Sequence, residues 1–174
     1  VELLGRKPQV GGKHREEIKT ARTGDPIGLG LNVIGGWEKT RRTVHPGYVI
    51  SHLDNVPAVT DEFSARVVIL NHPSTIAVGY SPTVYAHKAM VRCYLKSIDA
   101  TYDPATLKPA ENFGYLKKGD VANVTFKTME PIVLDLYNKI PPMGRFAVRE
   151  GGDKESRSET VMAGIVTGIL PKEN

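Results

Sequence analysis

Short runs of β-branched and aromatic residues, each bounded by Gly, Pro, Asn or Asp, recur through most of this chain. The run at residues 121–127 (VANVTFK) alternates apolar and polar side chains, as expected of a half-buried strand. No stretch keeps a clear helical period, and the best helix candidate, residues 13–22, is equally compatible with a strand and loop. The pattern predicts an all-β barrel or sandwich. Strands are expected at residues 65–70, 82–87, 89–95, 121–127, 132–136, 145–149 and 160–166.

A domain boundary is expected near Asp54, where a polar stretch containing Pro57 separates two apolar regions. Residues 1–53 hold few large apolar side chains, so they should form an incomplete barrel or lean on the second domain. We interpret residues 54–62 as a linker and residues 63–172 as a complete domain.

Two stretches of the second domain are predicted to be loops. Residues 99–112 indicate a long hairpin loop, and the charged residues 153–158 indicate an exposed insertion between two strands. The core should be built from inward-facing apolar residues of the strands, and the candidates are Phe63, Val67, Ile69, Val84, Val91, Val124, Phe126, Val133, Phe146, Val148 and Val166.

Composition excludes several classes of protein. A hydrophobic fraction of 40% suits a globular core rather than a disordered tail. No apolar run reaches the length of about 18 residues that a membrane helix needs, so no membrane span is expected. The single Cys93 rules out an internal disulfide and indicates a reducing, cytosolic setting. A formal charge of +4 is compatible with a nucleic-acid partner but does not identify one.

Residue types that could support catalysis or metal binding occur without the spacing that these chemistries need. The three Gly-Gly pairs are not followed by Lys-Ser or Lys-Thr, so they indicate turns rather than phosphate loops. The histidines and Cys93 lack zinc-site spacing, and there is no Gly-x-Ser-x-Gly elbow. His72 is expected to shape a turn and His87 to lie on a strand. We expect no catalytic residue, metal site or cofactor in this chain.

Four motifs occur in the order found in one protein family: residues 68–82 (VILNHPSTIAVGYSP), 113–124 (FGYLKKGDVANV), 144–149 (GRFAVR) and 161–166 (VMAGIV). From Asp54 onward the chain resembles the third domain of elongation factor 1-alpha and elongation factor Tu, in the archaeal and eukaryotic form. The resemblance covers roughly two-thirds of the chain, and several motifs in order are more specific than one. It implies a closed six-stranded antiparallel β-barrel preceded by part of a second β-barrel.

The first fifty residues resemble the end of that family's second domain more loosely. Residues 24–32 (GDPIGLGLN) are similar to a turn and strand of that domain, and residues 40–47 take the place of its Arg-Arg-Gly segment. The sequence holds no Gly-x-x-x-x-Gly-Lys-(Ser/Thr) loop. The resemblance therefore implies a C-terminal piece or a truncated relative, with GTP and Mg²⁺ confined to a GTPase domain that the sequence does not contain. This chain alone is not expected to hydrolyse GTP.

The resemblance also implies a function. In the family, the third domain grips the acceptor and T stems of aminoacyl-tRNA through backbone and phosphate contacts, which read shape as double-stranded RNA requires. The implied partners are aminoacyl-tRNA, the GTPase domain of the same protein, the ribosome and a nucleotide-exchange factor, in the cytoplasm. The matching positions are Tyr80, Ser81, Thr83, Lys88, Arg92, Arg149, Glu150, Gly151 and Gly152. Lys117 and Lys118 are candidates for further phosphate contacts, although a solvated strand edge explains a single lysine equally well.

Two departures from the family keep other functions open. Glu130 precedes Pro131 where the family usually has lysine, and a carboxylate near phosphates is unfavourable. Residues 153–158 lengthen a turn that is shorter in the family. One alternative is a release- or ribosome-rescue-type GTPase with a protein cargo, a branch that residues 134–137 (LDLY) somewhat resemble. Another is a stand-alone β-barrel binding module.

Overall fold

The computed structural model is all-β in the residues that it describes, and it divides into two compact units, Val1–His45 and Pro46–Asn174. Within the described part of the chain there is no helix that is long and apolar enough to cross a membrane. The described residues are 3–6, 17–18, 20–25, 27–31, 44–52, 54–103, 106, 108–110, 114–150 and 159–170.

The first unit contains a three-stranded antiparallel sheet. Strand β1 (Leu3–Arg6) lies between β2 (Glu17–Ile18) and β3 (Gly28–Leu31) and pairs with both. Residues 13–22, which the sequence left open between helix and strand, contain strand β2.

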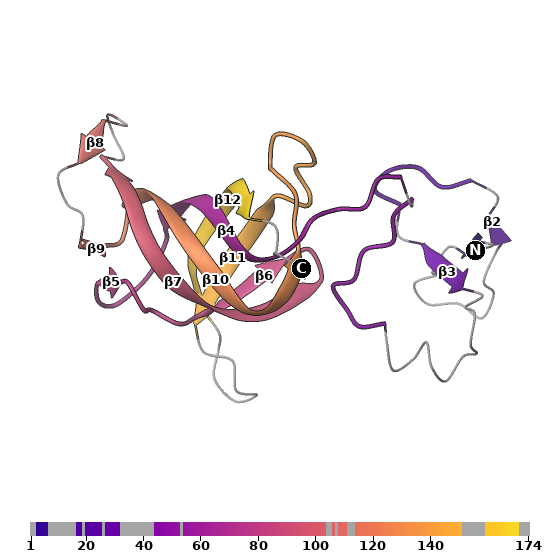
Figure 1. The fold of residues 1–174 in the computed structure, drawn as a ribbon, viewed down its shortest axis with the longest axis horizontal. Helices are drawn as coiled ribbons and strands as arrows, with labels where there is room; N and C mark the ends of the chain where they lie inside the picture. The colour runs from indigo at the N-terminus through magenta and orange to yellow at the C-terminus, as the bar shows by residue number, and fades with distance from the viewer. Residues whose placement is uncertain are drawn as a thin grey trace. The chain divides into compact units, whose positions relative to one another are not determined.

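The second unit is a closed barrel of six antiparallel strands, as predicted (Figure 1). The strands are hydrogen-bonded in the order β10-β4-β12-β11-β6-β7, and β7 pairs with β10 to close the ring. Closure leaves none of the six as a free edge. The six strands are β4 (Val59–Ile69), β6 (Thr83–Ala86), β7 (Ala89–Tyr102), β10 (Val121–Val133), β11 (Arg145–Glu150) and β12 (Glu159–Leu170).

Two short pairings complete the second unit. Strand β8 (Pro109–Ala110) extends the sheet beyond β7, and β5 (Ile76–Ala77) pairs with β9 (Tyr115–Leu116) in a separate two-stranded sheet. The predicted long hairpin loop at residues 99–112 is therefore wrong in extent, because β7 continues to Tyr102 and pairs there with β8.

Three phenylalanines form the centre of the barrel core. The ring centroid of Phe63 lies 5.6 Å from that of Phe126 and 5.4 Å from that of Phe146, and Phe126 and Phe146 are 6.0 Å apart. All three side chains are buried. They come from β4, β10 and β11, so one aromatic cluster joins strands from distant parts of the sequence.

Val133 is the one predicted core residue that is not buried; it is only half-buried. Ile132 and Leu134 are buried instead, continuing the every-second-residue pattern of Val124 and Phe126 along β10, so Val133 lies on the opposite face. The predicted separate strand at residues 132–136 is also wrong: Ile132 and Val133 end β10, and residues 134–136 are not in a strand.

His87 was predicted to lie on a strand, and this is wrong. It lies in the turn between β6 and β7 with φ of 44°, a left-handed conformation that is uncommon outside glycine. Its Nε2 is 2.9 Å from the carbonyl oxygen of Val133. His72 does shape a turn, because its Nδ1 lies 3.2 Å from the backbone nitrogen of Ser74.

The chain from Pro46 onward is expected to fold by itself and to be about 1 kcal/mol more stable than one starting at Asp54. Gly47, with φ of +100°, packs so tightly on Ala89 that an added Cβ would lie 2.8 Å from the Ala89 Cα. A start at Asp54 removes this contact. Urea unfolding of the two truncated chains tests the expectation. Equal midpoints would show that residues 46–53 add nothing, and a non-cooperative transition from Pro46–Asn174 would show that the barrel needs the first unit.

Candidate nucleic-acid interface

Arg149, Thr83 and Arg92 form a row across three strands. Arg149 of β11 is directly opposite Thr83 of β6, and Thr83 is directly opposite Arg92 of β7. Their neighbours Val84, Val91 and Val148 are buried, so the row faces outward. Side chains directly opposite each other have Cβ atoms about 4.5–5.5 Å apart. The register thus brings together three residues that are far apart in sequence, and we call them the arginine row.

Tyr85 and Met90 lie beside the arginine row on the same outward face. The Arg149 guanidinium carbon is 5.5 Å from the centroid of the Tyr85 ring, a cation–π contact, and Arg149 is half-buried with its Nε covered. Tyr85 is opposite Met90, which is 65% exposed. Sequence reasoning missed both residues. The alternation of β6 could have found Tyr85, because residues two apart on a strand share a face.

Glu150 lies one residue beyond Arg149, at the base of the β11–β12 hairpin. Its Oε2 is 3.2 Å from Nε2 of His72, a side chain that is 7% exposed, against 52% for Glu150. Glu150 is directly opposite Glu159, which accepts a hydrogen bond of 3.1 Å from Nδ2 of Asn71. At the base of the hairpin, Asn71 therefore contacts the Glu159 carboxylate and His72 contacts the Glu150 carboxylate.

Tyr80 and Ser81 are held mainly by contacts inside the protein. The Tyr80 ring packs on the core and meets the His72 ring edge-on at 5.4 Å. Its hydroxyl is buried and interacts with the Glu150 carboxylate. Burial first, and the Glu150 carboxylate second, raise the pKa of Tyr80 far above its usual value, so the hydroxyl stays protonated. The Ser81 hydroxyl donates to the carbonyl oxygen of Cys93 at 3.0 Å.

The predicted lysines lie away from the arginine row. Lys88 is in the β6–β7 turn, whereas the Thr83–Arg92 pair is at the other end of that hairpin. Lys117 lies in the turn before β10 with its Nζ 5.1 Å from the centroid of the Tyr115 ring, and Lys118 follows it. Gly151 and Gly152 lie outside the described residues, as does the insertion at residues 153–158.

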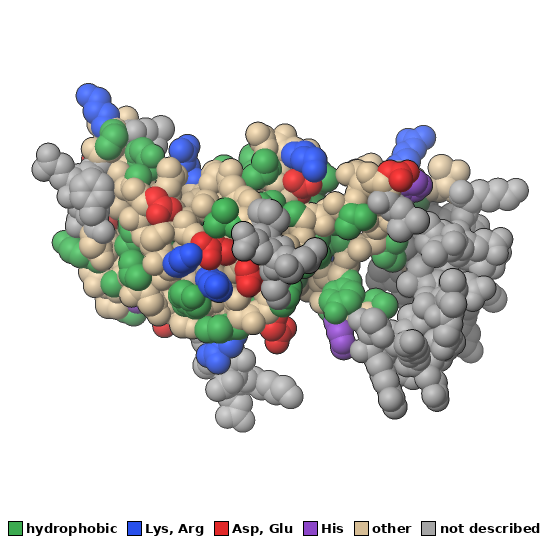
Figure 2. Space-filling view, in the orientation of Figure 1, with side chains coloured by type: hydrophobic (Ala, Val, Ile, Leu, Met, Phe, Trp, Pro, Cys, Tyr) green, Lys and Arg blue, Asp and Glu red, His purple; other side chains and the backbone are tan. Residues whose placement is uncertain are grey.

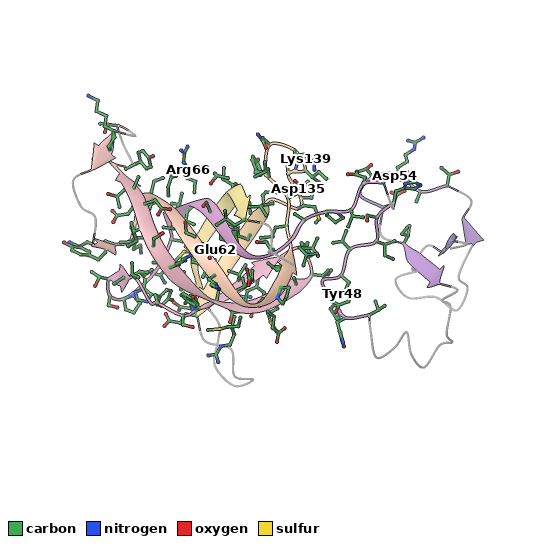
Figure 3. All side chains as sticks on the ribbon, in the orientation of Figure 1. Tyr48, Asp54, Glu62, Arg66, Asp135 and Lys139 are labelled. Atoms are coloured by element: carbon green, nitrogen blue, oxygen red, sulfur yellow. The ribbon has the colours of Figure 1, made fainter. Side chains whose placement is uncertain are left out.

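The face over β7 and β10 differs in charge pattern from the arginine row. Figure 2 shows basic and acidic side chains interspersed over these two strands. One such pair is Lys96 Nζ and Glu62 Oε1, 2.6 Å apart, and Figure 3 labels Glu62 over the middle of the barrel. Charges of mixed sign cancel at a distance and attract an anion weakly. Among the described residues, no group of three or more His, Cys, Asp or Glu side chains could hold a metal ion.

Comparison with known proteins gives consistent matches. The family model described as "GTP-eEF1A C-terminal domain-like" matches residues 62–167. The chain is 38% identical over 159 residues to elongation factor 1-alpha of Saccharolobus solfataricus, covering 91% of this chain and 34% of that protein. It is 42% identical over 160 residues to elongation factor 1-alpha of Methanocella arvoryzae, covering 91% and 35%. The chain thus spans about a third of the length of these curated relatives.

Solved structures match as well. A structure described as "crystal structure analysis of sup35 complexed with GMPPNP" superimposes with a TM-score of 0.75 at 26% identity, covering 89% of this chain and 35% of that one. A second, of sup35 complexed with GDP, gives a TM-score of 0.79 at 24% identity and agrees in fold.

Proposed function

The chain belongs to the GTP-eEF1A C-terminal domain-like family, and from this premise we propose that its barrel binds the double-helical stem of an aminoacyl-tRNA for delivery to the ribosome. The observation that carries the proposal is the arginine row, which the strand register assembles on the outer face of β6, β7 and β11.

The arginine row has the chemistry that a phosphate backbone requires. A guanidinium presents five N–H donors in a fixed fork that matches phosphate oxygens. Neighbouring strands are about 4.8 Å apart, so Arg149 and Arg92, separated by one strand, can reach different phosphates of one RNA strand. The Thr83 hydroxyl between them can contact a phosphate or a ribose 2′-hydroxyl. Contacts of these kinds read the shape of an RNA helix and not its sequence.

The proposal extends to a larger protein, since the chain spans about a third of its curated relatives. We assign GTP and Mg²⁺ to a GTPase domain outside this sequence, against which the barrel region packs. The ribosome and a nucleotide-exchange factor are the further proposed partners.

One argument for a protein cargo is that residues 134–137 (LDLY) somewhat resemble the release-factor branch. Leu134 is fully buried and Asp135 is 6% exposed, with Asp135 Oδ2 3.1 Å from Nζ of Lys139 (Figure 3). A structural role in shaping this loop accounts for both residues, so this motif adds no support to a cargo surface. A stand-alone barrel module is disfavoured by family membership.

Replacing Arg92 or Arg149 with alanine is expected to weaken binding of aminoacyl-tRNA about tenfold each, because each change removes a charge-assisted contact. The log–log dependence of affinity on salt should become shallower by roughly one unit per lost phosphate contact. Different tRNA species should be affected alike, since backbone contacts carry no base information. Fluorescence titration of labelled aminoacyl-tRNA at several salt concentrations measures all three effects.

Arg66→Ala is the matched control. Arg66 lies on β4, its guanidinium carbon is 5.5 Å from the centroid of the Tyr102 ring, and Figure 3 shows it on the outside of the barrel. It therefore loses the same charge and the same kind of ring contact away from the arginine row. Equal weakening by Arg66→Ala and Arg149→Ala would show that net charge alone governs binding. Absence of saturable binding by the unmodified chain would contradict the proposed function.

A further inference from the structure

Arg66 on β4 is held in place by side chains from two other strands. Its Nε–H donates to Oδ1 of Asn123 on β10 at 3.1 Å, and its guanidinium carbon lies 5.5 Å from the centroid of the Tyr102 ring on β7. Asn123 in turn donates from Nδ2 to the Tyr102 hydroxyl at 3.0 Å. The three side chains therefore support one another across three strands, and we call them the Arg66 cluster.

The Arg66 cluster keeps the end of an exposed arginine available for binding. Figure 3 shows Arg66 on the outside of the barrel, and its contacts with the described residues use Nε and the face of the guanidinium. The two terminal nitrogens carry four of the five guanidinium N–H donors, in the planar arrangement that binds a carboxylate through parallel hydrogen bonds. An arginine that is already held loses less side-chain freedom when it binds.

The outward-facing residues around Arg66 combine apolar side chains with a second arginine. Val68 follows Arg66 on the same face of β4 and is 41% exposed, and Ile165 of β12 is directly opposite Arg66. Arg145 of β11, which is exposed, is directly opposite Ile165 on its other side. Since neighbouring strands are about 4.8 Å apart, the two arginines flank Ile165 at a separation of about 10 Å. Among the described residues, none of those next to Arg66 on this face of β4, β10 and β12 is Asp or Glu.

This composition fits a protein partner better than a nucleic acid. Arginine and tyrosine are the residue types that most often dominate the binding energy of protein interfaces, and an apolar centre excludes water from the charged contacts around it. A phosphate backbone would place hydrated charges against Ile165 and Val68. Two positive charges with no carboxylate between them favour a protein surface of the opposite sign.

We propose that the Arg66 cluster is part of a second docking surface, which binds an acidic protein segment in which two carboxylates flank an apolar side chain. The terminal nitrogens of Arg66 bind one carboxylate and Arg145 binds the other, while Ile165 and Val68 contact the apolar side chain. Arg145 and Arg149 lie near opposite ends of β11, so this surface is separate from the arginine row and does not depend on RNA binding.

The test uses the full chain and a synthetic probe, the peptide Glu-Gly-Leu-Gly-Glu, whose three side chains share one face when the peptide is extended. Two-dimensional ¹⁵N NMR of the arginine side chains follows the titration, and the Nε–H signals of Arg66 and Arg145 should shift and saturate together. Two control peptides, Gln-Gly-Leu-Gly-Gln and Glu-Gly-Ser-Gly-Glu, lack the charges or the apolar side chain, and each should bind at least about fivefold more weakly.

Substitutions in the chain separate the guanidinium from its charge. Arg66→Lys keeps the charge but lacks the planar fork, and it should weaken peptide binding about fivefold. Asn123→Ala removes the support of Nε and should weaken binding about threefold. Lys117→Ala is the matched control, because Lys117 Nζ also lies over a tyrosine ring, 5.1 Å from the centroid of Tyr115, and its loss should leave the peptide affinity unchanged.

Three results would overturn the proposal. One is the absence of a saturable shift of the Arg66 signal, and this result does not depend on whether any variant folds. Another is equal binding of the peptide with leucine and the peptide with serine, or equal weakening by Arg66→Lys and Lys117→Ala, which would indicate general attraction between charges. The third is a shift of the Arg66 signal by aminoacyl-tRNA in place of the peptide, which would assign this surface to nucleic acid.

Discussion

Replacing Phe63 with alanine is expected to destabilise the barrel by about 3–5 kcal/mol, a large share of the roughly 5–15 kcal/mol that keeps a domain folded. Phe63 is fully buried and contacts the rings of both Phe126 and Phe146. Its removal forfeits the transfer free energy of the ring, leaves a cavity and breaks two aromatic contacts at once. A rigid closed barrel cannot collapse fully into that space.

Urea unfolding followed by far-ultraviolet circular dichroism measures the change. Val68→Ala is the control, because Val68 lies on the same strand with 41% of its surface exposed, and its loss should cost less than about 1 kcal/mol. If the two substitutions shift the midpoint equally, the phenylalanine cluster is not the centre of the stability.

Gly144→Ala is expected to cost about 3 kcal/mol or more, despite adding only one methyl group. A Cβ at this position would lie 2.4 Å from both the backbone nitrogen and the Cα of Tyr137, and 2.9 Å from the carbonyl oxygen of Asp135. These neighbours are backbone atoms, so no side-chain rotation can relieve the overlap. The loop before β11 would have to move away from the barrel.

The matched control for this prediction is Gly114→Ala, where a Cβ would meet no atom within 4 Å. Alanine there restricts the unfolded chain and should leave stability unchanged or raise it by up to about 1 kcal/mol. Thermal unfolding of both variants decides the matter. If the Gly144→Ala chain unfolds at the same temperature as the Gly114→Ala control, the loop before β11 can shift without cost.

The barrel could be anticipated from the sequence because alternation is a local signal. Strands such as β10 and β11 repeat apolar residues at every second position, and this period sets which face is buried. Val133 departs from the prediction because residues 132 and 133 end β10 rather than begin a separate strand, and the period that buries Val124 and Phe126 also buries Ile132 and turns Val133 to the other face. His87 was assigned to a strand because the residues on either side of it favour strands, but its φ of 44° is a turn conformation that histidine adopts more often than most non-glycine residues.

The candidate interface was visible in the sequence only in pieces. Thr83, Arg92 and Arg149 came from the family resemblance, and only the pairing of β6 with both β7 and β11 places them in one row. Register between distant strands is a tertiary property, so the opposition of Thr83 to both arginines could not be inferred from the sequence. The same holds for the His72–Glu150 contact, which joins residues 78 positions apart across the barrel end.

The position of β12 between β4 and β11 has a consequence for synthesis of the protein. Glu62 of β4 pairs with Leu170 of β12, so the β4–β12 pairing cannot form until the last strand has been synthesised. While the chain emerges from the ribosome, β4 presents one unpaired edge until β12 has been made. Non-local pairing of this kind slows folding, and exposed edges during that interval favour aggregation. Nascent chains arrested before residue 159 should therefore be the species that molecular chaperones bind most.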